Sequence, residues 1–283
     1  MRNPAIWAVV AIYAVFAAGK PLLVDTPYFA LVPLVSILAP VLFVLLHAPR
    51  QIGWKNLGVF FVLAFVISWS YESLSIATGF PFGNYHYTED LGWQLGTVPL
   101  LIMPAYFGVC YISWLIARTL IDALAPGRSY HWSVVLVAAF VMVMWDLSMD
   151  PSRATINLTW IWHDGGAYFG VPFVNFAGWF LCVATIFAAF AIWLARSAAK
   201  DVVSPDRMAQ AQALGLYAGL FAEFVAFTVF GPKTGTVTDA VGQVWNLRDI
   251  YESLGLVSIF TMGFVIVLTA LKLVAAGRDE AAR

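Results

Sequence analysis

The stretch WSVVLVAAFVMVMWDLSMD, residues 132–150, is almost entirely apolar, yet it carries two acidic residues near its end. Its length is close to the ~20 residues that a helix needs to cross a bilayer. Asp146 and Asp150 are spaced i, i+4, which places both side chains on one face of a helix. The stretch therefore predicts a membrane-spanning helix whose last turns carry a polar face.

Similar apolar stretches fill most of the remaining chain. Hydrophobic residues make up 61% of the 283 residues and charged residues only 11%, whereas soluble domains carry ~25% charged residues. This composition excludes a soluble domain and predicts an all-α polytopic bundle, with residues 1–283 forming one integral-membrane domain. We expect eight spans, or seven as the alternative because the first is short: 4–22, 29–47, 57–78, 98–121, 132–150, 173–195, 212–231 and 254–274.

The distribution of basic residues predicts the orientation of these spans. With eight spans, one side holds only four of the 15 Lys and Arg residues, namely Lys20, Arg153, Lys233 and Arg248. Because cytoplasmic loops are enriched in Lys and Arg, we expect a multi-pass protein of the inner (plasma) membrane with both termini in the cytoplasm. The outer side then has three substantial loops, at about 79–97, 151–172 and 232–253.

Four acidic residues fall within the predicted spans, and each of them is expected in the outer half of the bilayer: Glu72, Asp146, Asp150 and Glu223. An acidic residue in a span costs ~2.5–3.5 kcal/mol and marks a functional site by default. No Lys or Arg lies mid-span to pair with them. Burial without a cation favours the neutral acid, which is the form that a general acid needs. The structural alternative is that these residues cap helices or bond to Ser, Tyr and Trp across the bundle.

The sequence gives no sign of a cofactor. Two histidines lie in outer loops among aromatic residues, in Tyr85-His86-Tyr87 and Trp160-Ile161-Trp162-His163, but no His-x-x-x-His or Glu-x-x-His spacing accompanies them. We therefore expect no metal site. The chain also lacks a Gly-x-Gly-x-x-Gly fingerprint, a P-loop and a Gly-x-Ser-x-Gly elbow, so no nucleotide, flavin or acyl-enzyme chemistry is predicted. A net charge of −1 argues against nucleic acid as a partner.

A faint internal repeat connects two of the predicted hairpins. Val98-Pro99 is followed, after six residues, by Tyr106-Phe107, and Val171-Pro172 is followed, after six residues, by Trp179-Phe180. Glu72 and Asp146 each stand late in the span that precedes one of these segments. Parallel duplication would explain the pattern, and so would chance. In both segments the proline suits the first turn of a helix, where no amide hydrogen is needed.

Two sequence blocks resemble a known family. The first is Thr78-Gly79-Phe80-Pro81-Phe82-Gly83-Asn84-Tyr85-His86-Tyr87, with Leu91-Gly92 and Val98-Pro99-Leu100 after it. The second is Trp145-Asp146-Leu147-Ser148-Met149-Asp150-Pro151, with Trp160-Ile161-Trp162, Tyr168-Phe169-Gly170-Val171-Pro172 and Asn175-Phe176-Ala177-Gly178-Trp179 after it. Together they resemble the integral-membrane carotenoid biosynthesis proteins of the CruF type, which include carotenoid hydratases.

The resemblance implies hydration of the terminal isoprenoid double bond of an acyclic carotenoid end, which gives a tertiary alcohol. It implies a substrate such as lycopene, gamma-carotene or a fifty-carbon precursor, in the lipid bilayer and in the company of other carotenoid pathway enzymes. The family's motif acids correspond to Glu72, Asp146 and Asp150, which become the expected catalytic residues. The expected substrate-binding residues are Asn84, Tyr85, His86, Tyr87, Trp145, Trp160, Trp162, His163, Asn175 and Glu223.

Acid catalysis of this reaction suits the residue types in the two blocks. An acid protonates the alkene, a tertiary cation forms, and water adds to the cation. Asp146 or Glu72 would be the acid, Asp150 the base for water, and Trp and Tyr rings would stabilise the cation. The same buried acids would also suit a non-redox transporter or a carotenoid-binding protein, which remain the alternatives.

Overall fold

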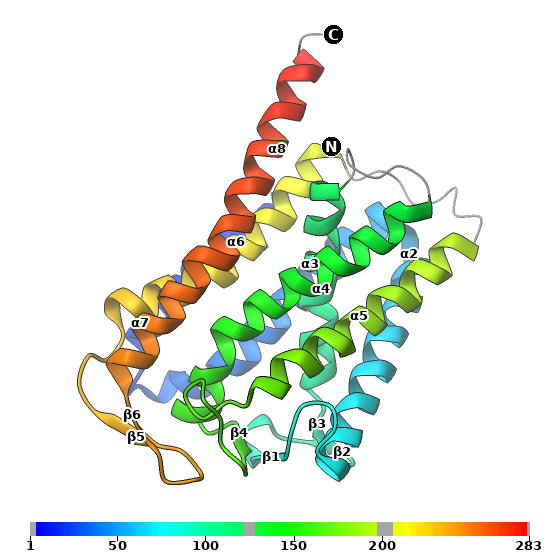
Figure 1. The fold of residues 1–283 in the computed structure, drawn as a ribbon. Coiled ribbons are helices and arrows are strands. Elements are labelled where there is room, and N and C mark those ends of the chain that lie inside the picture. The colour runs from blue at the N-terminus through cyan, green and yellow to red at the C-terminus, as the bar shows by residue number, and fades with distance from the viewer. Residues whose placement is uncertain (1–3, 122–127, 197–205, 282–283) are drawn as a thin grey trace.

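The protein is a bundle of α-helices with short strands gathered at one end, as the computed structural model shows (Figure 1). The structure describes residues 4–121, 128–196 and 206–281. The α-helices are α1 (Pro4–Gly19), α2 (Val32–Thr78), α3 (Ile102–Ile121), α4 (Arg128–Pro151), α5 (Phe173–Arg196), α6 (Arg207–Phe230), α7 (Leu247–Ser258) and α8 (Phe264–Ala281). The strands are β1 (Tyr85–Tyr87), β2 (Gln94–Leu95), β3 (Val98–Pro99), β4 (Trp160–Trp162), β5 (Thr236–Thr238) and β6 (Val244–Asn246).

Seven helical stretches within the described residues are long and apolar enough to cross a membrane. They are Pro4–Leu23, Pro27–Thr78, Ile102–Ile121, His131–Ile156, Phe173–Arg196, Arg207–Phe230 and Leu247–Arg278. Large apolar side chains such as Val62, Phe140 and Leu271 are exposed on them, as lipid-facing positions would be. The predicted all-α, multi-pass class is therefore confirmed, while the sidedness of the termini stays a prediction.

The structure has seven such helices rather than eight, because the second and third predicted spans form one stretch of 52 residues. A straight helix of that length would measure ~78 Å, far more than the ~30 Å of a hydrocarbon core. The stretch is not straight, since Gly53 inside it has φ 74° and ψ 158°, a backbone conformation that glycine tolerates. Figure 1 shows α2 turning back on itself as two arms, so the two predicted spans survive as the arms of one kinked helix.

Helix α3 lies at the centre of the bundle, and most of its side chains are buried. It packs against α2 and α4, α4 packs against α5, and α1 packs against α6. Aromatic rings fill the space around α3: the ring centroids of Phe60 and Phe190 are 4.8 Å apart, and those of Trp114 and Phe190 are 5.5 Å apart. Burial of these large rings holds the helices together.

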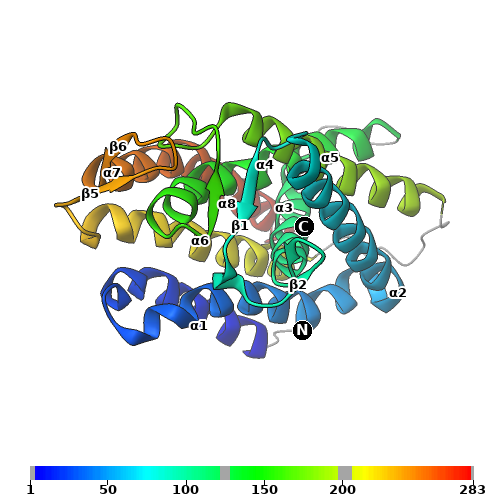
Figure 2. The ribbon, with the colours of Figure 1, turned by 90° about the horizontal axis from the view of Figure 1, so that it is seen from below.

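The predicted outer loops are ordered by strand pairing. β1, in the loop after α2, pairs antiparallel with β4, in the loop after α4, with His86 opposite Ile161 at the centre of the register. β2 with β3 and β5 with β6 form two further antiparallel pairs. Figure 2, seen from this end, shows β1 crossing the ends of the helices. Two loops far apart in sequence thus form one cover over the bundle.

Candidate active site

A cavity of about 110 Å³ lies under this cover, and helices α1 to α6 and the segments next to the strands supply the rest of its wall. Most of the lining is apolar or aromatic. The strands contribute Tyr85, Tyr87, Trp160 and Trp162. Among the described residues, four with charge-bearing side chains line the cavity: Glu72, Asp150, Arg153 and Glu223. Such an apolar cavity with a few polar groups is the usual form of a site for a small apolar ligand.

Glu72 is enclosed by three tyrosines. Tyr87 and Tyr106 donate hydrogen bonds to its carboxylate oxygens, each at 2.9 Å, and Tyr85 donates a third. Two of these donors come from β1, where side chains alternate between faces, and Tyr106 comes from α3. Three O–H donors hold the Glu72 carboxylate in one orientation at the cavity wall.

Burial, reinforced by the nearby Glu72 carboxylate, raises the pKa of Tyr85 and of Tyr87 well above its usual range. Both effects oppose a second negative charge at this place. The two hydroxyls therefore stay protonated and remain hydrogen-bond donors to Glu72.

Asp150 and Asp146 differ in their surroundings although they share a face of α4. Trp160 Nε1 donates to Asp150 Oδ1 at 2.8 Å, and the Asn175 amide donates to Asp150 Oδ2. Asp146 is fully buried, and neither of its oxygens has a hydrogen-bond partner among the described residues. Asp146 does not line the cavity, so Asp150 is the aspartate that a ligand in the cavity could touch.

The two histidines face away from the cavity. His86 lies between Tyr85 and Tyr87 on β1, so strand alternation turns it to the opposite face of the cover. Its Nδ1 lies 2.6 Å from Nε2 of His163, and both rings are outside the cavity lining. Asn84 donates to Asp164 at 2.7 Å on the same exposed side. Asn84, His86 and His163 are therefore absent from the cavity lining, and their part in substrate binding stays a prediction.

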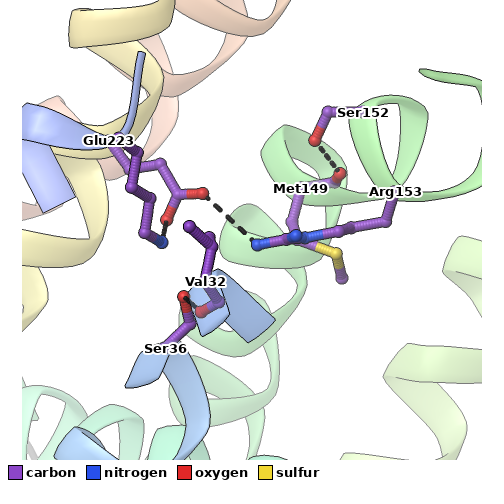
Figure 3. Close-up of polar contacts among 7 residues, drawn as sticks. Val32, Ser36, Met149, Ser152, Arg153 and Glu223 are labelled. Carbon is purple, nitrogen blue, oxygen red and sulfur yellow. Dashed lines mark hydrogen bonds and ion pairs between the residues drawn. The ribbon is translucent and has the colours of Figure 1, made fainter. Parts of the chain in front are cut away.

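Glu223 lines the cavity but is not the unpaired acid that the sequence suggested. Lys20, fully buried, forms an ion pair with one of its carboxylate oxygens, and Arg153 Nη2 lies 3.5 Å from the other (Figure 3). The expectation that no cation reaches the acids is wrong for Glu223. It failed because Lys20 is 203 residues away in sequence and is brought there by the packing of α1 against α6.

Several cavity residues were missed at the sequence level. Tyr106 and Trp179 both line the cavity, and their rings stack with centroids 4.4 Å apart and planes 4° apart. The two residues stand at corresponding positions of the Val-Pro repeat, and that repeat is the sequence signal that could have identified them. Tyr13 of α1 also lines the cavity, and nothing in the sequence distinguished it from other aromatic residues of the spans.

Aromatic rings surround the acids. Trp145, predicted for the site, lines the cavity beside Trp160 and Trp162. The Trp162 ring lies 4.8 Å from that of Tyr85, and its Nε1 has no hydrogen-bond partner among the described residues. The wall thus offers π faces for a cation and one N–H donor for an oxygen atom. Within residues 4–121, 128–196 and 206–281, no three His, Cys, Asp or Glu side chains gather as ligands of a metal ion would.

Comparison with known proteins gives matches at two levels. A family model described as "Carotenoid biosynthesis protein" matches residues 31–241, a range that includes Glu72, Asp146, Asp150 and Glu223. A bisanhydrobacterioruberin hydratase of Haloarcula japonica is 30% identical over 129 residues. That match covers 45% of this chain and 42% of the relative, so it spans less than half of each protein. No solved structure matches the chain.

Proposed function

The chain belongs to the carotenoid biosynthesis protein family, and from that premise we propose that it is a carotenoid hydratase. It adds water to the terminal isoprenoid double bond of an acyclic carotenoid end and forms a tertiary alcohol. The observation that carries the proposal is the pair of anchored acids, Glu72 and Asp150, on the wall of a largely apolar, aromatic cavity. The distant relative named as a hydratase supports it.

The reaction needs three things from the protein. A proton must reach the less substituted alkene carbon, the resulting tertiary cation must be stabilised, and one water molecule must add to that cation. The water then loses a proton to a base, and that proton must return from the base to the acid before the next turnover, so no cofactor is consumed. General acid–base groups contribute about 10²–10⁴-fold to such steps.

Asp150 is the proton donor in this proposal, and Asp146 supports it. Both residues are buried, one helical turn apart, and no described Lys or Arg pairs with either. Burial and like charge both oppose a second negative charge on this pair, so at least one of the two carboxyls stays neutral. Asp150 presents its proton to the cavity, while Asp146 acts through Asp150 as a positioning residue.

Glu72 and the indole rings stabilise the cation. We assign Glu72 the carboxylate form, which the three tyrosine donors favour against the opposing effect of burial, and this charge attracts a nearby cation. The faces of Trp145, Trp160 and Trp162 add cation–π attraction of about 2 kcal/mol or more each in a site shielded from water. The same carboxylate can take the proton that the attacking water releases.

Placement in the membrane suits this substrate. We propose that the whole chain forms one domain of the inner membrane, with both termini cytoplasmic and the cavity in the outer half of the bilayer. The described spans then let the polyene remain in the bilayer or between helices while only its end enters the cavity. Other carotenoid pathway enzymes would supply the acyclic substrate and use the alcohol.

Expression in a lycopene-producing bacterium tests the proposal. Pigments are extracted, and their masses are compared with those from cells that carry an Asp150→Asn variant at equal membrane abundance. A gain of one or two waters only with the unaltered chain supports a hydratase. Pigment that co-purifies with the protein unchanged in mass would instead favour the carotenoid-binding alternative.

A further inference from the structure

A buried cluster of three charges lies in the cavity wall, outside the group formed by Glu72 and Asp150. One carboxylate oxygen of Glu223 pairs with Lys20 and the other with Arg153, and Figure 3 shows the Arg153 side of the cluster. The three side chains come from separate elements: Lys20 from the turn after α1, Glu223 from α6 and Arg153 from the π-helical turn Ser152–Ile156. With two cations and one carboxylate, the cluster carries an excess positive charge that no described acid in contact neutralises.

This cluster separates two cavities. Arg153 and Glu223 line the main cavity and also line a smaller one of about 20 Å³ beside it. The smaller cavity has these further lining residues: Phe29, Val32, Ser152, Asn157, Phe227 and Tyr251. Val32 and Ser36 stand one turn apart on α2, Val32 at the smaller cavity and Ser36 at the main one. The Arg153–Glu223 pair is therefore the shared wall between them.

Two groups at this wall, the Tyr13 hydroxyl and the Arg153 guanidinium, have hydrogen-bond donors for which the described residues provide few acceptors. The Tyr13 hydroxyl lines the main cavity, is buried and has no hydrogen-bond partner among the described residues. It lines the same cavity as Glu223 and Arg153. The guanidinium of Arg153 has five N–H donors, and its one described ion pair is the 3.5 Å contact with Glu223. Buried polar groups left in this state typically hold ordered water.

Building on the proposed function, we propose that the Tyr13–Arg153–Glu223 cluster is a water-binding site that admits the second substrate, water, to the reaction cavity. Water passes from the smaller cavity, along the Arg153–Glu223 pair, to the Tyr13 hydroxyl. Among the described residues, the charged Arg153–Glu223 pair lines both cavities, so this wall is a polar route from the smaller cavity to the main one. A reaction that adds one water to a cation needs such a controlled supply.

The two cations have different parts in this site. Lys20 is fully buried, in direct contact with Glu223, and lies 5.3 Å from the centroid of the Phe16 ring, so it fixes the carboxylate. The Arg153 contact is longer, and the Arg153 side chain keeps 13% of its surface exposed. Arg153 is therefore the movable half of the wall, and removing it leaves the Lys20–Glu223 pair balanced in charge.

Cysteine accessibility tests this route without depending on hydration. Cys110 and Cys182, both free and buried, are first replaced by alanine in the full chain. Val32→Cys or Ser36→Cys is then introduced, and an impermeant anionic methanethiosulfonate reagent is added to the outer side of intact cells. Because Val32 is only 2% exposed, we expect the thiols of both Val32→Cys and Ser36→Cys to react slowly while Arg153 is in place. Adding Arg153→Ala should speed reaction of Ser36→Cys at least tenfold and leave Val32→Cys unchanged.

The matched control is Arg248→Ala, which removes an exposed arginine paired with Glu252 and away from both cavities. It should alter neither rate. An unchanged rate at Ser36→Cys in the Arg153→Ala protein would overturn the inference, whether or not the chain proves to be a hydratase. A failure of the proposed function shows separately, as the absence of any hydrated pigment with the unaltered chain.

Hydration by the same variants gives a second readout. Arg153→Ala should let methanol in the medium compete with water, so that part of the product is the tertiary methyl ether, formed when the methanol oxygen bonds to the cation and its proton goes to the base. Arg153→Lys, which keeps the charge, should restore the alcohol as sole product. A purely structural role for Arg153 would change protein abundance but not the ratio of ether to alcohol, and an unchanged ratio in Arg153→Ala would contradict the proposed route.

Discussion

Tyr106 of α3 stacks on Trp179 of α5, with ring centroids 4.4 Å apart and ring planes 4° apart. The two residues stand at corresponding places after Val98-Pro99 and Val171-Pro172, and the loops before them pair through β1 and β4. Two similar helix–loop–helix segments therefore meet face to face, and the cavity lies where they meet. Glu72 comes from the first segment and Asp150 from the second, so each segment supplies one acid to a shared site.

Replacing Asp150 tests the proposed proton donor. Asp150→Asn keeps an acceptor for Trp160 and nearly the same volume, but it removes the transferable proton. We expect conversion to fall about 10²–10⁴-fold while the protein still accumulates in the membrane, as measured by pigment mass against immunoblot. Asp164→Asn, an exposed change outside the cavity lining, is the control and should retain conversion. Equal activity of the two variants would remove Asp150 from the mechanism.

The other two acids should also be needed. Glu72→Gln removes the charge proposed to stabilise the cation, and Asp146→Asn removes the neighbouring carboxyl that opposes a negative charge on Asp150. We expect each variant to lose nearly all product at normal abundance, scored by the same pigment assay. Wild-type conversion by either would exclude that residue from the chemistry.

Neighbouring residues of β1 should differ sharply in effect. Tyr87→Phe removes a hydrogen bond to the charged Glu72, worth about 1.5–3 kcal/mol, which corresponds to about 10–100-fold in rate. His86→Gln alters the exposed face of the same strand and should change the rate less than about twofold by this reasoning. Initial rates of the purified proteins separate the two. A larger loss of rate with His86→Gln would mean that the outer histidines contribute more to the reaction than the tyrosines that donate to Glu72.

Alkaline titration tests the buried tyrosines. Because the pKa of Tyr85 and of Tyr87 is raised in the folded protein, their contribution to stability is fully present below the ordinary tyrosine value of ~10. It is lost as the pH rises from there toward the folded-state values. The melting temperature of the detergent-purified protein should therefore fall above pH ~10, and fall less in Tyr87→Phe. An identical pH dependence of melting in both proteins would show that Tyr87 is not a buried, protonated donor.

The Glu223 ion pairs should contribute to stability. Glu223→Gln leaves Lys20 and Arg153 buried without a carboxylate, which typically costs about 3–5 kcal/mol. Glu252→Gln breaks the exposed pair with Arg248 and should cost less than about 1 kcal/mol. Thermal unfolding in detergent compares the two variants. Similar melting temperatures of the two variants would mean that the buried ion pairs of Glu223 with Lys20 and Arg153 are not formed in the protein.

The sequence was sufficient for the helical class, and it pointed to Glu72, Asp150 and Glu223, which line the cavity. Long apolar spans that contain acidic residues are typical of membrane proteins with a functional site, and the catalytic roles of these acids stay predictions. The number of separate helices was harder to predict from the sequence. The turn within α2 depends on the backbone conformation of one residue, Gly53, and the pattern of apolar residues does not indicate that conformation. The Lys20–Glu223 pair joins residues 203 positions apart, a contact that only the packing of α1 on α6 creates.

The site residues likewise divide into those that the sequence could identify and those that only the fold reveals. Tyr85 and Tyr87 point to Glu72 and His86 points away because β1 is a strand, whereas the motif alone treats the three residues alike. Strand alternation in Tyr-His-Tyr could have separated them. Tyr106 could have been predicted from its position in the Val-Pro repeat. The partners of Asp150, Trp160 and Asn175, were both named from their motif, but which acid they hold could be learned only from the fold.

The central claim is that this cavity adds water to a carotenoid double bond, and oxygen-18 water tests it most directly. Purified protein is incubated with an acyclic carotenoid in H₂¹⁸O under normal air, and the product is analysed by mass spectrometry. We predict a tertiary alcohol whose oxygen is ¹⁸O, and no such product from Asp150→Asn. An alcohol that carries unlabelled oxygen, or a carotenoid recovered unchanged, would contradict the account.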